Sequence, residues 1–457
     1  MSSQVKRLSA TNDIQSSVKD TNESGVPAGL SDYVCLVGAY LFFRLPFLFM
    51  LPMVEAPDEF AHFWVIKFLR ENLRLPDAHE VLAGGASAVY GSLPQLGYIP
   101  HVICSFILSH DYLALAERFG SLLMGQVMLF AAFNIGRILF PKNRVAALAV
   151  PAAIILHPQL AFIHSYANND STSSALASLL IWLSFETVNK GLAPGRTVWI
   201  GVLTGWLAIT KYSGLAVIPS IALALIASVF LNGTSFGLAI PLMLGAVSVA
   251  VLVSGWWFWQ NNLQYPGDFM GTKTMYKNWA VTFNRDLNYY LPVSHIIKDH
   301  RWWRMTFFSY WGLFGYMNKY LWKFVYWIYG GFVVSSLIGV LSSAFLYRKL
   351  PPKKELVMWS SLALCYIVNI GLMIGASTKN LGGPQGRYLI TSEIPIMALI
   401  IGGMSLLADK YLNLFSRKMS VGNLLIVAFL VYNAIVCVGS WIYLFRLYNG
   451  WHLDPLI

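Results

Sequence analysis

Hydrophobic residues occur along the chain in long blocks that are separated by short polar stretches. A helix needs about 20 consecutive apolar residues to cross roughly 30 Å of hydrocarbon. Blocks of this kind occupy residues 31–52, 112–139, 145–164, 171–188, 198–230, 236–256, 320–346, 355–374, 388–407 and 421–445. The block 198–230 is too long for one crossing and contains Lys211, so we expect two helices that turn within residues 210–214. The pattern predicts an all-α polytopic membrane protein with about eleven transmembrane helices.

The composition agrees with this prediction and excludes an ordinary soluble domain. Of the 457 residues, 56% are hydrophobic and only 12% are charged, against about 45–50% and about 25% in soluble domains. The net charge of +11 fits basic cytoplasmic loops better than nucleic-acid binding, which we do not expect. Four cysteines without a CxxC pair or a histidine cluster indicate neither a disulfide framework nor a zinc site.

The distribution of basic residues predicts the orientation of the chain. The polar residues 1–30 lack a signal-peptide core, so we expect a disordered cytoplasmic tail followed by one transmembrane module, residues 31–457. If this tail is cytoplasmic, the predicted crossings place the short basic loops on the cytoplasmic side as well. They contain Arg137, Lys142, Arg144, Lys190, Arg196, Arg348, Lys349, Lys353, Lys354, Lys410, Arg417 and Lys418. The loops 53–111, 257–319 and 375–387 then face outward, and residues 101–109 are too short to span, which predicts a re-entrant or interfacial helix.

The first outer loop begins with an acidic motif. If Pro57 takes the first helical position, Glu55, Asp58, Glu59 and His62 follow at i, i+3, i+4 and i+7 and share one helical face. Such acids could simply complement the dipole of an interfacial helix. Carboxylates at the end of a membrane span are costly unless they have a task, which favours a functional interpretation.

Basic and acidic residues at other outer turns allow two interpretations each. Asp170 could cap a helix, or hold a cation or a sugar hydroxyl. The stretch 382–388 combines glycines with Arg387, whose planar fork of donors suits phosphate oxygens. Arg387 could instead reach the membrane interface, paired with Glu393, and Lys211 has the same two interpretations. Arg44, inside the first span, needs a partner or a water-filled cavity.

Several short motifs recur together in the order found in a known group of proteins. They are Pro-Asp-Glu-x-x-His-Phe (57–63), Pro-x-x-x-Tyr (94–98), Asn-Asn-Asp (168–170), Leu-x-x-x-Thr-Lys-Tyr-Ser-Gly (207–214), Gly-Trp-Trp-x-x-x-Asn (255–261) and Gln-Gly-Arg-Tyr (385–388). In this respect the chain resembles a bacterial multi-spanning family within the GT-C superfamily of polyprenyl-phosphate-dependent glycosyltransferases. The resemblance covers nearly the whole chain after the tail.

The resemblance implies a GT-C bundle with interfacial helices in the first outer loop and a catalytic acid after the first span. Carried over by position, Asp58 and Glu59 match the catalytic acids. The residues expected to bind substrate are His62, Asp170, Lys211, Gln385, Arg387 and Tyr388. Many GT-C enzymes carry a large soluble domain after the last span, whereas only residues 446–457 follow here, so the second outer loop would have to bind the acceptor.

These features together predict a glycosyltransferase of the bacterial inner membrane. It would move a sugar, with inversion, from a polyprenyl-phosphate carrier to a cell-envelope glycan or lipid-linked acceptor on the extracytoplasmic face. Asp58 or Glu59 would take the proton, and Arg387 and Lys211 would stabilise the phosphate. Asp58, Glu59 and Asp170 could also bind Mg²⁺ or Mn²⁺. The alternatives are a transporter or flippase of lipid-linked glycans, or a non-catalytic scaffold.

Overall fold

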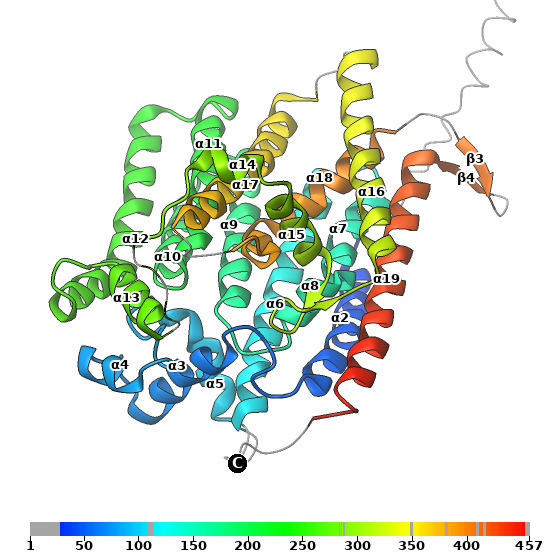
Figure 1. Ribbon diagram of the computed structural model, residues 1–457. Helices are drawn as coiled ribbons and strands as arrows, with labels where there is room; N and C mark the ends of the chain where they lie inside the picture. Colours follow the sequence, from blue (N-terminus) through cyan, green and yellow to red (C-terminus); the bar gives the residue numbers. More distant parts are fainter. Residues whose placement is uncertain are drawn as a thin grey trace, which may run out of the picture.

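The computed structural model describes residues 28–107, 113–282, 284, 286, 288–347, 351–379, 383–407, 411–414 and 417–452. Over these residues the chain forms a bundle of long helices, and the short helices of residues 59–105 pack at its lower end in Figure 1. The predicted tail, residues 1–30, lies outside the described part except for its last three residues.

A helix or a pair of consecutive helices lies at each predicted crossing. They are α2 (Leu30–Met50), α6 (Leu113–Leu139), α7 (Arg144–Leu156) with α8 (Pro158–Ile163), α9 (Asp170–Lys190), α10 (Pro194–Ala208), η3 (Tyr212–Val217) with α11 (Ile218–Leu231), α12 (Phe236–Gln264), α16 (Lys323–Ser342) with η4 (Ser343–Tyr347), α17 (Lys353–Thr378), η5 (Gly386–Ser392) with α18 (Glu393–Ser405), and α19 (Val421–Leu447). By length and composition, 8 segments among the described residues could cross a membrane. The all-α membrane fold is therefore confirmed, and the number eleven stays a prediction.

The outer segments of the prediction contain short helices. The first holds α3 (Glu59–Asn72), α4 (Ala78–Gly84), η1 (Leu96–Tyr98) and α5 (Ile99–Ser105). The second holds α13 (Thr272–Thr282), α14 (Val293–Lys298), α15 (His300–Trp311) and the antiparallel strands β1 (Leu313–Phe314) and β2 (Lys319–Tyr320). A second hairpin, β3 (Tyr411–Leu414) with β4 (Arg417–Ser420), lies at the upper right of Figure 1, far from α3, α4 and α5. The short helix expected within 101–109 is thus present as α5.

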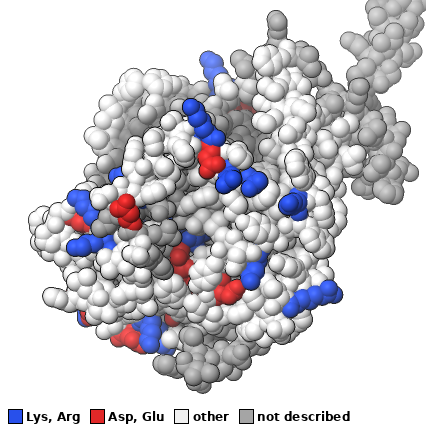
Figure 2. Space-filling view, in the orientation of Figure 1, with Lys and Arg blue, Asp and Glu red and all other residues white. Residues whose placement is uncertain are grey.

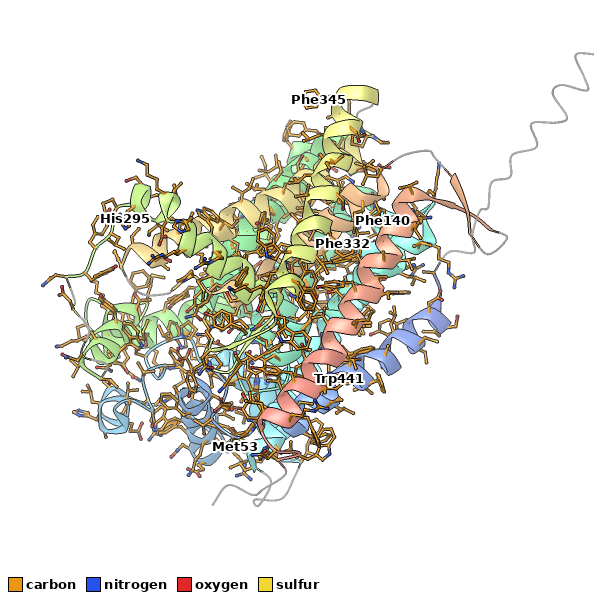
Figure 3. The ribbon with its side chains drawn as sticks, turned by 45° about the vertical axis from the view of Figure 1, so that its right-hand side comes forward. Met53, Phe140, His295, Phe332, Phe345 and Trp441 are labelled. Carbon is orange, nitrogen blue, oxygen red and sulfur yellow. The ribbon has the colours of Figure 1, made fainter. Side chains whose placement is uncertain are left out.

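The start of the first predicted outer loop and the end of the helical segment 323–347 lie at opposite ends of the bundle. Met53, at the start of the first outer loop, lies at the opposite end from Phe345, which precedes a basic loop (Figure 3). Between the ends, most of the visible surface is uncharged, and Lys, Arg, Asp and Glu form small mixed groups (Figure 2). Such a surface suits helices whose sides face lipid.

Arg44 bonds to the backbone at the break between α7 and α8, the two helices of the predicted crossing 145–164. It is fully buried, and its two terminal nitrogens donate to the backbone carbonyls of Ile155 at 2.5 Å and Ile154 at 2.6 Å. Pro158 has no N–H to offer to the carbonyl of Ile154 at this helix end. The partner that Arg44 requires is therefore the backbone of a helix terminus.

The core positions the segment that carries Arg387. The helices α6, α7, α9 and α18 supply many of the buried residues. A Cβ on Gly386 would lie 2.1 Å from the backbone nitrogen of Tyr310. Only glycine permits this approach, which packs η5 against α15 and fixes the direction of the next residue, Arg387.

Candidate active site

The chain turns sharply between the first span and the first outer helix. Asp58 has a left-handed backbone with φ of 62°, and α3 begins only at Glu59. The predicted helical face through Glu55, Asp58, Glu59 and His62 is therefore wrong, and Pro57 lies in a turn rather than at the first helical position. The left-handed residue is incompatible with a helix that starts earlier, so the two acids are directed into different surroundings.

Glu59 anchors the turn to α6. Its carboxylate accepts two hydrogen bonds from Arg118, at 2.8 and 2.9 Å, and a third from the backbone N–H of Val54 at 3.0 Å. Arg118 also donates to the carbonyls of Leu51 and Pro52. Both side chains are buried, and neither lines a cavity. Sequence reasoning missed Arg118, which follows Glu117 at the start of a predicted span and carries no motif of its own.

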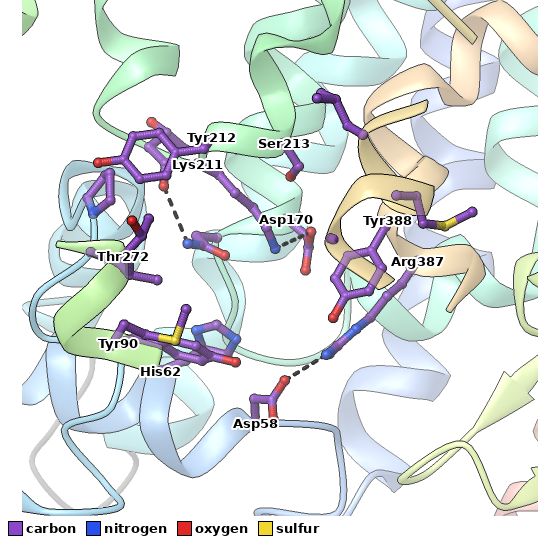
Figure 4. A pocket seen from close by; sticks show the side chains of 18 of the residues that line it. Asp58, His62, Tyr90, Asp170, Lys211, Tyr212, Ser213, Thr272, Arg387 and Tyr388 are labelled. Carbon is purple, nitrogen blue, oxygen red and sulfur yellow. Dashed lines mark hydrogen bonds and ion pairs between the residues drawn. The ribbon is translucent and has the colours of Figure 1, made fainter. Parts of the chain in front are cut away.

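Asp58 instead meets the guanidinium of Arg387. Nη2 of Arg387 donates to Oδ2 of Asp58 at 2.6 Å, across 329 positions of the sequence (Figure 4). Partial burial raises the pKa of the Asp58 carboxyl, but the charge and the hydrogen bond of Arg387 outweigh it and leave this pKa below its ordinary value. The expected pairing of Arg387 with Glu393 is wrong, because Glu393 bonds Nδ1 of His157 at 2.7 Å.

A second ion pair lies on the opposite wall. Lys211 lies between α10 and η3. Its Nζ donates to Oδ1 of Asp170 at 2.6 Å. Asp170 is the first residue of α9, but the N-cap is Asn169, so Asp170 does not cap this helix. The turn expected within residues 210–214 therefore delivers Lys211 to an acid from the preceding outer turn.

The two pairs border one cavity of about 260 Å³. The residues that line it are Asp58, His62, Tyr90, Leu93, Pro94, Asn169, Asp170, Thr210, Lys211, Tyr212, Ser213, Thr272, Met275, Asn369, Leu372, Met373, Ala376, Arg387 and Tyr388. The ring centroid of Tyr388 lies 5.4 Å from the Arg387 guanidinium carbon and 6.0 Å from Nζ of Lys211, so both cations flank one ring. Six of the eight predicted site residues thus meet here.

His62 contributes a neutral imidazole to this cavity. Its Nδ1 lies 2.6 Å from the hydroxyl of Tyr98, and its ring stacks on Tyr90 at 5.0 Å. Burial lowers the pKa of His62 to about 3, although Asp58 opposes the shift. His62 is therefore uncharged at neutral pH. Tyr90 was missed by sequence reasoning because it stands between Val89 and Gly91 and belongs to no motif.

Gln385 and Glu59 are the two predicted site residues that do not line the main cavity. Gln385 borders a hollow of about 10 Å³ together with Tyr166 and Ser309, and Arg387 separates this hollow from the main cavity. Gln385 therefore lies behind Arg387, as seen from the main cavity.

The recurring motifs build the walls of the cavity. Trp257 donates from Nε1 to Oε1 of Gln95 at 2.8 Å, which joins α12 to the turn before η1. Thr172 donates to the carbonyl of Gly97 at 2.7 Å. Motifs that are far apart in the sequence are thus in direct contact around one site.

The acids do not form a ligand set for a divalent cation. Asp58 and Asp170 are each paired with a cation, and Glu59 is bound by Arg118. Among the described residues no group of three or more His, Cys, Asp or Glu side chains is arranged to hold a metal ion. The three-carboxylate site for Mg²⁺ or Mn²⁺ therefore does not fit this arrangement, and no step below uses a metal.

Comparisons with known proteins agree with the architecture. Residues 103–259 match the dolichyl-phosphate-mannose-protein mannosyltransferase family. An oligosaccharyltransferase of Archaeoglobus fulgidus, solved with a tethered acceptor peptide containing the NVT sequon, aligns at 12% identity with a TM-score of 0.50, covering 94% of this chain and 56% of that chain. The fold is of the GT-C type. The apo form of the same protein aligns at 12% identity with a TM-score of 0.47, over 93% and 56% of the two chains.

The family match over residues 103–259 and the alignment with a TM-score of 0.50 support the GT-C superfamily. The chain spans about half the length of the oligosaccharyltransferase, 56%, and no curated protein sequence matches it. The specific bacterial family that the motifs resemble stays a prediction.

Proposed function

We propose that the protein is a glycosyltransferase that moves a sugar from a polyprenyl-phosphate carrier to a cell-envelope glycan or lipid-linked acceptor on the extracytoplasmic face of the bacterial inner membrane. The observation that carries this proposal is the cavity in which a carboxylate of the first outer loop, Asp58, meets Arg387 and Lys211. A base and two cations in one partly enclosed space are the groups that sugar transfer from a phosphate requires.

The transfer exchanges one bond at the anomeric carbon for another. An acceptor hydroxyl attacks this carbon, its proton passes to the Asp58 carboxylate, and the bond to the carrier phosphate oxygen breaks with inversion. The Asp58 side chain is 33% exposed, so an acceptor hydroxyl can reach it. Glu59 cannot serve in this way because Arg118 and a backbone N–H occupy both of its oxygens.

The departing phosphate needs positive charge. The guanidinium carbon of Arg387 lies 5.4 Å and Nζ of Lys211 lies 6.0 Å from the centre of the Tyr388 ring, so a fork of donors and a point charge both border the cavity beside this ring. Fixed cations in a site shielded from water stabilise the developing charge more than they would in solution.

The remaining lining fits a sugar that carries a lipid tail. The rings of Tyr90, Tyr212 and Tyr388 and the neutral His62 offer stacking faces and hydrogen bonds to sugar hydroxyls. Met275 and the apolar residues 372–373 supply an apolar border where the isoprenoid chain can leave the cavity. Thr272 and Met275 belong to α13, so the second outer loop contributes to the site as an acceptor-binding segment should.

The flippase alternative lacks a comparable observation. A flippase needs polar groups that line a passage through the depth of the membrane. Arg44, His157 and Glu393 lie in the spans, but they are fully buried, bond to other protein groups and line none of the cavities described above.

Purified protein supplied with a lipid-linked sugar and envelope acceptor tests the proposal. Asp58→Asn should lower turnover by about 10²–10⁴-fold, the usual contribution of a positioned base, with an unchanged melting temperature. Glu71→Gln, in an exposed pair with Lys67 on the same helix α3, is the matched control and should keep full activity. Full turnover in Asp58→Asn would remove this residue from the mechanism.

A further inference from the structure

The two cations of the cavity are already neutralised in the absence of substrate. Asp58, Asp170, Lys211 and Arg387 are the charged residues that line it in the described part of the chain, and His62 is neutral. The four formal charges sum to zero. A cavity without net charge attracts an anion only weakly, although phosphate binding is what the cations should provide.

The two ion pairs can separate, because each is held by few contacts and borders the cavity. Each has one short contact, between Arg387 Nη2 and Asp58 Oδ2 and between Lys211 Nζ and Asp170 Oδ1. The exposed fraction is 33% for the Asp58 side chain and 21% for Lys211. When the pairs separate, Asp58 reaches solvent and both cations face the ligand, whereas Asp170, whose side chain is only 8% exposed, lines the cavity and faces the water or ligand inside it.

We propose that Asp58 and Asp170 are resident counter-ions, which the donor phosphate displaces from Arg387 and Lys211, so that donor binding itself frees Asp58 to accept a proton. This inference rests on the proposed function and deepens it. It makes Asp170 a competitor of the donor for Lys211, rather than a ligand of the sugar, and hence a positioning residue that keeps Lys211 aimed into the cavity.

The exchange also couples base strength to donor binding. While Arg387 is bound to Asp58, it keeps the pKa of that carboxyl low, and a carboxylate with a low pKa is a poor base. Once phosphate oxygens take the guanidinium, Asp58 loses this stabilisation and faces a nearby anion, and both changes raise its affinity for a proton. Asp58 is thus a competent base only when donor is present.

The test measures binding without transfer. A short-chain prenyl phosphate is titrated into the full-length protein in detergent at constant ionic strength, by calorimetry. Asp170→Asn should bind it about fivefold more tightly than wild type, the gain expected when a partly exposed charge pair no longer has to open. Glu71→Gln should leave the affinity unchanged. Unchanged or weaker binding by Asp170→Asn overturns the exchange while leaving the transferase proposal intact, and no binding by wild type overturns both.

Two further variants separate the exchange from a structural effect. In a Lys211→Met background the gain from Asp170→Asn should shrink, because Asp170 bonds Lys211 directly and acts on Arg387 only through its charge, and an undiminished gain contradicts the proposal. Asp58→Asn should bind prenyl phosphate more tightly than wild type although its turnover is lost. Asn tolerates the left-handed backbone of position 58, so this variant keeps the proposal falsifiable if Asp170→Asn does not fold. Weaker binding by Asp58→Asn would also overturn the exchange.

Discussion

Two neighbouring acids, Asp58 and Glu59, form ion pairs of opposite character. Glu59 and Arg118 are joined by two parallel hydrogen bonds, and their side chains are 0% and 2% exposed. Asp58 and Arg387 share one short contact beside a cavity, and Asp58 is 33% exposed. The number of bonds and access to solvent, rather than residue type, therefore distinguish a pair that holds the fold from a pair that a ligand can open.

Removing one partner of the buried pair should have the largest effect on stability. Arg118→Met leaves the Glu59 carboxylate buried without a cation and should destabilise the protein by about 3–5 kcal/mol. Thermal unfolding in detergent measures this loss. Arg74→Met, which breaks the exposed pair with Glu80, is the control and should change stability little, because solvent screens exposed pairs. Equal effects of the two substitutions would contradict the distinction between the pairs.

The corresponding change at the cavity should affect binding more than stability. Arg387→Met removes charged hydrogen bonds to the donor phosphate, each worth about 1.5–3 kcal/mol, so affinity for a prenyl phosphate should fall by about tenfold or more. The affinity of Arg387→Lys for a prenyl phosphate should lie between those of wild type and Arg387→Met, because lysine keeps the charge and lacks the planar fork of donors. Titration of the three proteins checks this order. If Arg387→Met binds as well as wild type, Arg387 does not contact the donor.

The third prediction concerns pH and His62, the neutral histidine of the cavity. The pKa of His62 is lowered to about 3 in the folded protein, so the unfolded chain takes up a proton near pH 6.5 that the folded chain refuses. Stability due to neutral His62 is therefore present above about pH 6.5 and is lost toward pH 3, by at most about 1.4 kcal/mol per pH unit. His62→Gln should flatten the fall in melting temperature between pH 7 and pH 5.

A matched histidine defines the control for this pH effect. His79→Gln changes an exposed histidine in the same outer loop and should leave the slope of melting temperature against pH as in wild type. An identical slope in wild type and His62→Gln would show that His62 is not held neutral by burial. The rate of sugar transfer should show no titration of His62 between pH 5 and pH 8.

The sequence predicted the bundle well because hydrophobic length alone selects spanning helices. The short helix within 101–109 was predicted because its apolar block is too short to span, whereas residues 145–164 were predicted as one crossing and the break between α7 and α8 was missed. The start of α3 was predicted wrongly, since the pattern of acids at helical spacing gives no sign of the left-handed backbone at Asp58. That one dihedral angle decides which acid reaches the cavity.

The sequence predicted which residues lie at the candidate site, but it did not predict which of them form ion pairs with one another. Asp58, Asp170, Lys211 and Arg387 were expected near one another from the resemblance, and the structure brings them to one cavity. Their partners depend on contacts across as many as 329 positions, which local patterns do not contain. For the same reason the partners of Glu59 and Glu393, Arg118 and His157, could not be foreseen.

The left-handed backbone at Asp58 limits which amino acids the position can accept. Asn and Gly tolerate this conformation, whereas a β-branched residue adds steric strain of about 1–2 kcal/mol before any chemistry is considered. A library of substitutions at position 58 should therefore divide into two classes, folded but inactive proteins with Asn or Gly and poorly folded proteins with Val or Ile. Sorting a library by expression level before activity would show how strongly backbone geometry restricts the residues that position 58 can accept.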